Sequence, residues 1–202
     1  EIAQSESITG KTYVNYWMHN NFLNDTTGKM SKSNDDFLTL PVINEKGYSS
    51  LAYRYLLLMT HYRKEINFSF ESLQAAATAY NKLRYWCHMN KNNNGNINEK
   101  YLNDCIDALN DDLNTSKCLA VLHILLNDKT IPEEDKYVTI MQIDELLGID
   151  LINRNSTPVI AEMTATLVRN KNYSKDIENL LTNRALARER KEYTESDRLR
   201  DE

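Results

Sequence analysis

The feature that most constrains the fold of this chain is how rarely its helical pattern is broken. Its 202 residues include only five Gly and three Pro, the two residues that most often end helices and strands. Such a chain favours long helices over many short strands. Folding at this length buries roughly 70% of the unfolded surface, so a full hydrophobic core is within reach. We therefore predict a mainly α-helical protein.

From about residue 48 onward, apolar residues recur at the spacing of one helix face. A short polar residue precedes most of these apolar stripes, and its side chain suits the N-cap position. Helices joined by short connections predict a helical bundle. The expected helix starts lie at Ser49 or Ser50, Ser69, Asn98, Asn114 or Thr115, Pro132, Thr157 with Pro158, and Ser174, and Gly148 is expected to be a C-cap.

Residues 1–45 have a different pattern. The segment 12–18 is rich in β-branched and aromatic residues, which predicts a buried strand or strand-like segment. Residues 24–28 have the composition of a turn, and a polar stretch follows them. Pro41 and Gly47 bracket a further stretch that we expect to be irregular.

Composition and charge argue against several classes of protein. The longest near-apolar stretch, residues 118–126, contains His123 and is too short for a membrane-spanning helix. Three Cys are too few for a disulfide framework, and no secretory signal starts the chain, so we expect a cytoplasmic protein. The net charge of -5 argues against indiscriminate nucleic-acid binding.

The segment Lys29-Met30-Ser31-Lys32-Ser33 has the most specific order in the chain. Its two ammonium groups are spaced by hydroxyls and follow Gly28, which lets a loop move. Such a loop can close over a polyphosphate, because lysines and hydroxyls stabilise the negative charge that grows in phosphoryl or nucleotidyl transfer. The alternative is a solvated surface loop, and the five-residue order argues against it.

The same five residues form the signature loop of class I aminoacyl-tRNA synthetases, and other segments resemble one family of that class, the cysteinyl-tRNA synthetases. The resemblance covers nearly the whole chain and is loosest between about residues 128 and 170. The segments that carry it are EIAQSE (1–6), NYWMHN (15–20), YRYLLL (53–58), HYR (61–63), NFS (67–69), DDLNT (111–115) and SDRLRD (196–201).

The resemblance implies a protein of two parts. Residues 1–75 would be the C-terminal part of an α/β class I catalytic domain, with the lysine loop and a region that contacts the tRNA stem. Residues 76–202 would be a helical tRNA-binding bundle of the anticodon-binding type. The implied function is that of a cysteine–tRNA ligase, which activates L-cysteine with ATP and transfers it to tRNA(Cys). We expect a monomer that does not bind membranes.

The family's loop also implies roles for individual residues of this sequence. Lys32 would contact the ATP phosphates, and Lys29 would act with it in catalysis. Met30, Ser31 and Ser33 would complete the ATP-binding loop.

Glu1 falls on a zinc-ligand position of the family, in which Zn²⁺ selects the cysteine thiolate, and it would bind zinc only if the ligands upstream of residue 1 are present. The family's His-x-Gly-His motif and its zinc-ligand Cys have no counterpart in this sequence, and the chain starts without Met. We therefore interpret the chain as the C-terminal part of a synthetase that lacks the N-terminal nucleotide-binding region. We expect this part to form no adenylate by itself.

Basic residues at two places are candidates for contact with tRNA phosphates. Arg54, Arg63 and Lys64 lie in the region that resembles the stem contact, and a solvated helix face is the alternative. Arg188 and Arg198 belong to the strongest basic run of the chain. Acidic residues within that run favour a single salt-bridged helix over an RNA-contact face.

Other reactive side chains have structural interpretations. Cys87, between Trp86 and His88, fits the core face of a helix better than a metal site. The pair at 111 and 112 is interpreted as capping the helix at Asn114 rather than binding a cation. His19 follows an aromatic segment and belongs either to a substrate pocket or to a core strand.

Two other functions remain open from the sequence. One is a related ligase that activates cysteine and joins it to an amino sugar, which the long helical extension disfavours. The other is a non-catalytic helical RNA-binding module that keeps the loop as a relic. A net charge of -5 permits that module without suggesting it.

Overall fold

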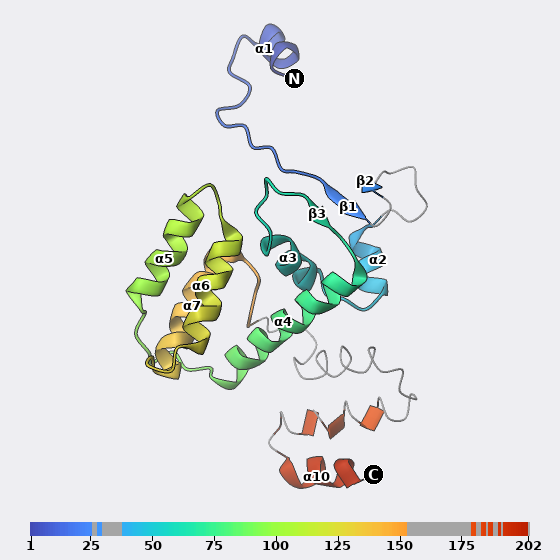
Figure 1. Ribbon diagram of the computed structural model, residues 1–202, viewed down its shortest axis with the longest axis vertical. Coiled ribbons are helices and arrows are strands. Elements are labelled where there is room, and N and C mark those ends of the chain that lie inside the picture. Colours follow the sequence, from blue (N-terminus) through green and yellow to red (C-terminus); the bar gives the residue numbers. More distant parts are fainter. Residues whose placement is uncertain are drawn as a thin grey trace.

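The computed structural model describes residues 1–25, 28–29, 38–152, 179–180, 183–184, 186–187, 190 and 192–201. The protein is mainly α-helical, as predicted, with one small sheet (Figure 1). Its helices are α1 (Ile2–Thr9), α2 (Leu40–Glu45), α3 (Ser50–Leu58), α4 (Phe70–Met89), α5 (Glu99–Asn110), α6 (Thr115–Asn127), α7 (Glu133–Leu147) and α10 (Tyr193–Asp201). Its strands are β1 (Leu23–Asp25), β2 (Gly28–Lys29) and β3 (Ile66–Asn67).

Short polar side chains start the central helices where the sequence predicted. Ser49 accepts a hydrogen bond from the backbone of Ala52, and Ser69 forms a reciprocal capping box with Ser72. The side chains of Asn98 and Asn114 each accept one backbone hydrogen bond, as Ser49 does, and cap α5 and α6. Gly148 ends α7 with a left-handed φ of 60°. These predictions are confirmed because a cap depends on residues within one turn of chain.

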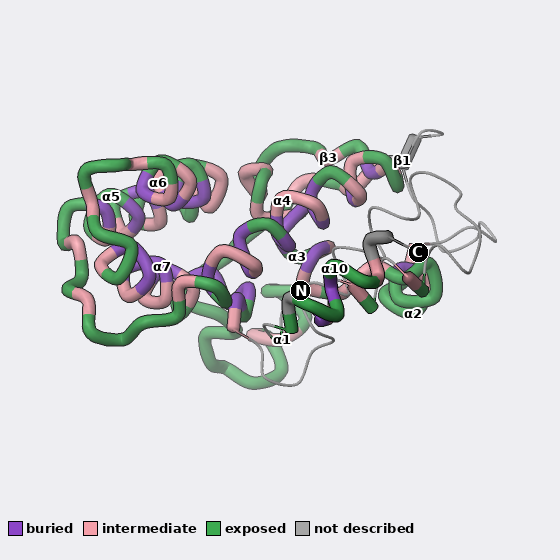
Figure 2. The backbone as a smooth tube through the Cα atoms, turned by 90° about the horizontal axis from the view of Figure 1, so that it is seen from below, coloured by how far each residue is buried: buried purple, intermediate pink, exposed green. Residues whose placement is uncertain are grey.

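The core lies between α3, α4 and the group formed by α5, α6 and α7 (Figure 2). Leu73 and Tyr80 of α4, Leu122 of α6 and Ile140 of α7 are fully buried. α4 runs from the sheet to the base of this helical group (Figure 1). α4 is continuous across residues 75 and 76, between which the sequence analysis placed the domain boundary. The boundary therefore falls within a helix and stays a prediction.

The sheet has the strand order β2–β1–β3. β1 pairs antiparallel with β2, Asn24 opposite Lys29, and parallel with β3, Leu23 opposite Ile66. The central strand is thus joined on one side to the start of the lysine motif. On its other side it is joined to the connection between α3 and α4.

The strand predicted at residues 12–18 is wrong. These residues are irregular, and Tyr16 is 89% exposed. They extend away from the body of the protein together with α1 (Figure 1). High β-propensity describes side chains that suit a half-buried sheet, and residues 12–18 pair with no strand in the part of the chain that is described. Trp17 instead stacks on His19, with ring centroids 6.0 Å apart.

Four helical segments also differ from the expectations. Pro41 does not mark an irregular stretch but stands in the first turn of α2, where its missing N–H costs nothing. α1 was not expected, and α3 ends at Leu58, before Tyr62. Arg190 lies in a turn and α10 starts at Tyr193, so the basic run is not one continuous helix. The expected starts at Thr157, Pro158 and Ser174 lie outside the described residues.

None of the helices in the described residues is long and apolar enough to cross a membrane.

Candidate functional site

The small sheet carries the start of the lysine motif. Lys29 ends β2, an edge strand whose backbone pairs with Asn24 of the central strand β1. The first residue of the motif therefore lies on a paired strand. Its other residues, Met30, Ser31, Lys32 and Ser33, lie outside the described residues, so their roles stay predictions.

Backbone hydrogen bonds tie β1 to the turn that follows α3. The Asn21 N–H donates to the Tyr62 carbonyl at 2.8 Å, and the Asn21 side chain donates to the Arg63 carbonyl at 3.0 Å. Farther along, the Ile66 N–H donates to the Phe22 carbonyl at 3.1 Å. These bonds connect the turn and β3 to Asn21 and Phe22, the two residues that precede β1.

A carboxylate between α5 and α6 holds the same turn. Asp112 accepts hydrogen bonds from Nε of Arg63 at 2.6 Å and from the Tyr62 hydroxyl at 2.5 Å. Nε2 of His61 lies 3.7 Å from the carboxylate. The hydrogen bonds from Arg63 and Tyr62, together with the Arg63 charge, lower the pKa of Asp112 to about 2. Asp112 is therefore ionised at neutral pH.

The capping interpretation is wrong for Asp112. Asn114 caps α6 with its own side chain, which accepts from the Lys117 N–H at 3.1 Å. The carboxylate of Asp112 points instead to Arg63, which lies 49 positions away in the sequence. No local pattern around residue 112 could have identified this partner.

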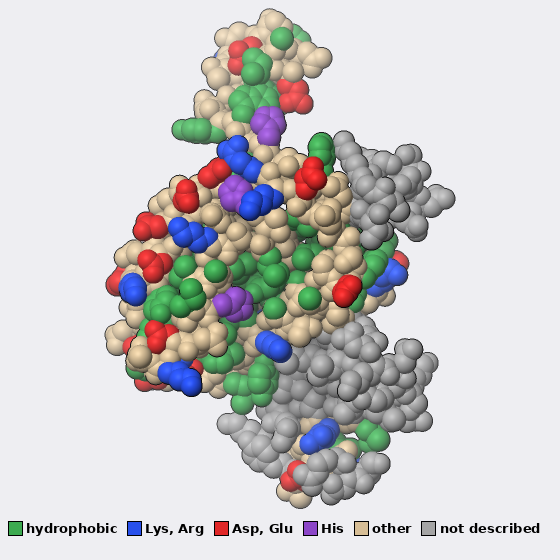
Figure 3. All heavy atoms as spheres, in the orientation of Figure 1, with side chains coloured by type: hydrophobic (Ala, Val, Ile, Leu, Met, Phe, Trp, Pro, Cys, Tyr) green, Lys and Arg blue, Asp and Glu red, His purple; other side chains and the backbone are tan. Residues whose placement is uncertain are grey.

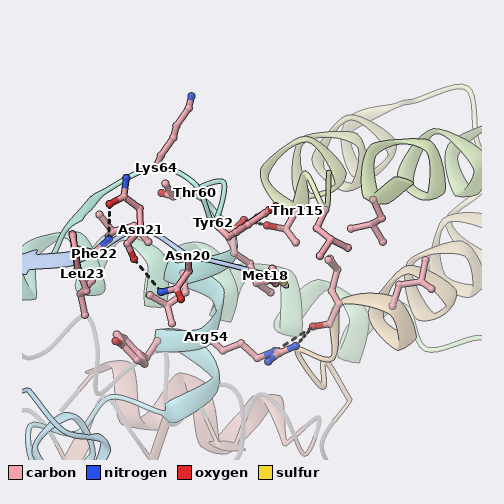
Figure 4. A pocket seen from close by; sticks show the side chains of 18 residues that line it. Met18, Asn20, Asn21, Phe22, Leu23, Arg54, Thr60, Tyr62, Lys64 and Thr115 are labelled. Carbon is pink, nitrogen blue, oxygen red and sulfur yellow. Dashed lines mark hydrogen bonds between the residues drawn. The ribbon is translucent and has the colours of Figure 1, made fainter. Parts of the chain in front are cut away.

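A pocket of about 570 Å³ separates the β1 segment from the helical group. Its walls come from the residues before β1, from α3 and the turn after it, and from the ends of α5, α6 and α7. Figure 4 shows that Lys64 points away from this pocket into solvent. The pocket is mostly apolar, with polar groups at its rim. Its lining includes Met18, Asn20, Phe22, Leu57, Tyr62, Leu113 and Thr115.

Arg54, a predicted tRNA contact, reaches across this region to α7 (Figure 4). Its Nη2 and Nε atoms donate to the Leu147 carbonyl at 2.7 and 3.2 Å. This carbonyl is at the negative end of the α7 dipole, where a cation is stabilising. The guanidinium thus has a structural partner, and its contact with tRNA stays a prediction.

The remaining predicted tRNA contacts are not gathered by the structure into one described group. Arg198 pairs with Glu195 on α10, at 2.8 Å between Nη2 and Oε1, which is the kind of pair that the acidic neighbours led us to expect. Arg188 lies outside the described residues. On the face drawn in Figure 3, Lys and Arg side chains are scattered among Asp and Glu around a hydrophobic centre.

The described residues do not form a zinc site by themselves, and the role of Glu1 as a ligand stays a prediction. Nowhere among them do three His, Cys, Asp or Glu side chains gather as a metal would require. Glu1 is exposed at the start of α1. Cys87, Cys105 and Cys118 are buried in the helices as free thiols. The core interpretation of Cys87 is therefore confirmed.

Comparison with known families gives one match. The profile of the family described as "tRNA synthetases class I (C) catalytic domain" matches residues 1–78. The match includes the small sheet, the lysine motif and the turn held by Asp112.

Whole-chain comparison finds many similar proteins. All residues of the chain align with the cysteine–tRNA ligase of Treponema denticola at 34% identity, over 45% of that protein. Cysteine–tRNA ligase 1 of Burkholderia lata is 36% identical over 40% of its length. The cysteine–tRNA ligase of Novosphingobium aromaticivorans is 34% identical over 43% of its length. The chain thus spans less than half the length of these relatives.

Proposed function

Because the chain belongs to the cysteine–tRNA ligase family of class I aminoacyl-tRNA synthetases, we propose that it acts as the C-terminal part of such an enzyme. The reaction joins L-cysteine to tRNA(Cys). The cysteine carboxylate attacks the α-phosphate of ATP, and pyrophosphate leaves. A hydroxyl at the 3′ end of the tRNA then attacks the cysteinyl carbonyl of the adenylate, an ester forms, and AMP leaves. This chain would supply the lysine segment and the helical part.

The observation that carries this proposal is the place of the lysine motif. Lys29 ends an edge strand next to β1, and β1 itself contributes Leu23 to the pocket of about 570 Å³. A lysine segment that starts there can reach a phosphate chain bound beside the sheet. In the proposal, Lys32 neutralises the charge that grows on the departing pyrophosphate, and Lys29 assists it.

The proposal also includes contacts between basic side chains and the phosphates of the tRNA. Lys64 is exposed and points away from the pocket, which suits a phosphate contact. Arg63 is 64% exposed in its side chain and keeps donor groups beyond its bonds to Asp112. Arg54, Arg188 and Arg198 complete the set of proposed tRNA contacts.

Two further points belong to the proposal. We place the enzyme in the cytoplasm as a monomer, where its three buried thiols remain reduced. Zinc enters no step proposed for these residues, because Glu1 has no neighbouring ligands among those described.

ATP–pyrophosphate exchange with cysteine, measured in the complete translated protein, tests the function. Lys32→Ala should lower kcat at least about tenfold and leave the KM for cysteine within about twofold. Lys129→Ala, which removes an exposed lysine after α6, is the control and should change neither quantity. Equal losses in both variants, or no exchange in the wild-type protein, would contradict the proposal.

Neither alternative function is favoured by the comparisons. The similar proteins described above are named as cysteine–tRNA ligases, and none carries the name of an amino-sugar ligase. A purely RNA-binding role would not explain the presence of the lysine motif.

A further inference from the structure

We propose that Asp112 is a positioning residue: from the helical part of the chain it sets the place of β1, and through β1 the place at which the Lys29–Ser33 segment starts. The effect of Asp112 on catalysis rests on the proposed function above. The effect of Asp112 on the position of β1 is argued from the contacts alone.

The backbone at this corner adopts a conformation that residues with side chains avoid. Asp112 and Leu113 have φ values of 54° and 53°, both left-handed, in the connection between α5 and α6. Asp tolerates this region better than most residues, whereas Leu does not. Strain of this kind persists only where the surroundings enforce it, and it is found most often at functional sites. Here the strained turn directs a carboxylate toward the chain that supports the lysine motif.

Tyr62 and Arg63 are held from two sides at once. Their side chains donate to Asp112, whereas their backbone carbonyls accept from Asn21, just before β1. The same two residues therefore connect the corner between α5 and α6 with the sheet. A separate bond from the Thr115 hydroxyl to the Leu58 carbonyl, at 2.9 Å, fixes the start of α6 to the end of α3.

The connection continues along the sheet to the motif. The Phe68 N–H donates to the Asn24 carbonyl at 2.7 Å, next to the β1–β3 pair. Asn24 in turn is the β1 residue that stands opposite Lys29. Direct contacts between neighbouring groups thus lead from Asp112 to Lys29, so a change at Asp112 can shift the residue at which the motif starts.

Asp112→Asn is the appropriate variant, because Asn also tolerates a left-handed φ but carries no charge. Asp128→Asn provides a matched control. Asp128 is likewise a carboxylate with a pKa of about 2 that accepts a tyrosine hydroxyl, from Tyr101 at 2.8 Å. It lies at the opposite end of α6, away from β1.

Amide hydrogen exchange on the complete translated protein tests whether Asp112 positions β1. In Asp112→Asn, the amides of Asn21, Ile66 and Phe68 should exchange about tenfold faster, while those of α4 and α7 keep their wild-type rates. The Asp128→Asn control should leave the three amides unchanged. Unchanged rates at these amides in Asp112→Asn, or equal acceleration throughout α4 and α7, would overturn the proposal.

Pyrophosphate exchange in the complete translated protein tests the catalytic consequence. Asp112→Asn should lower kcat about tenfold, as expected for a displaced catalytic group, with the KM for cysteine within about twofold and no loss in Asp128→Asn. A wild-type kcat in Asp112→Asn would overturn the proposal. Should the wild-type protein show no exchange, the proposed function fails, and the amide measurement still decides whether Asp112 positions β1.

Discussion

The hydroxyl of Tyr55 and Nε2 of His123 lie 2.7 Å apart and join α3 to α6. Tyr55 is 1% exposed, and burial raises its pKa to about 12. Burial also lowers the pKa of His123 below its ordinary value of 6.5. The pair therefore prefers a neutral imidazole, which has a consequence for stability at mildly acidic pH.

Stability should fall when the pH drops below about 6.5. The unfolded chain binds a proton at His123 more readily than the folded protein, so protonation favours unfolding, and the effect is complete below the folded-state pKa. Urea unfolding at pH 7.5 and 5.5 measures it. His123→Gln, which cannot be protonated, should reduce the difference between the two pH values. A folded-state pKa of His123 at or above 6.5, measured by NMR, would contradict the prediction.

Arg54→Met should lower the free energy of unfolding by about 1–2 kcal/mol, because the Leu147 carbonyl loses two charge-assisted hydrogen bonds. Arg54→Lys keeps the positive charge at the end of α7 and should lose less. Urea unfolding of the three proteins checks this order. If both variants unfold like the wild type while tRNA binding weakens, Arg54 is a tRNA contact and not a structural one.

Gly95→Ala should destabilise the protein by about 2 kcal/mol or more. A Cβ atom at this position would lie 2.2 Å from the carbonyl oxygen of Glu134, a backbone atom that cannot move aside easily. Gly10→Ala is the comparison, because a Cβ there meets nothing within 4 Å, although φ is +63°. Thermal unfolding should show a clearly larger loss for Gly95→Ala, and equal losses would argue against the close approach.

The three cysteines should not react with a thiol reagent in the folded protein. All are buried, and burial together with the nearby charge of Asp144 raises the pKa of Cys87 to about 12. A thiol in this state offers almost no thiolate at neutral pH. Labelling with an aromatic disulfide reagent should be slow without urea and complete in it. Rapid labelling of Cys87 under native conditions would disprove this burial.

Local rules predicted much of the helical part correctly. Ser69, Asn98 and Asn114 cap helices as expected, because the bonds that they accept come from residues three positions ahead. The strand prediction failed, because a strand also needs a partner strand from a distant part of the sequence. Residues 12–18 have the composition of a strand, but the strand that forms is β1, which has the backbone of β3 beside it.

The candidate site likewise has one part that the sequence predicts and one part that it does not. The order of Lys29-Met30-Ser31-Lys32-Ser33 is visible in the sequence, and that order alone indicates phosphate chemistry. The role of Asp112 is not visible there, because its partners Tyr62 and Arg63 come close only when the corner between α5 and α6 packs against the turn after α3.

Local sequence was enough to predict the helical class and the starts of α3 to α7, because a helix start depends on residues that are near one another along the chain. The chemistry of the lysine motif is also read from neighbouring residues and stays a prediction. Tertiary packing was needed to show that Asp112 binds Tyr62 and Arg63 and that Arg54 donates to the carbonyl at the end of α7. These contacts depend on distances in space between segments that are far apart in sequence, and packing of the whole core sets those distances.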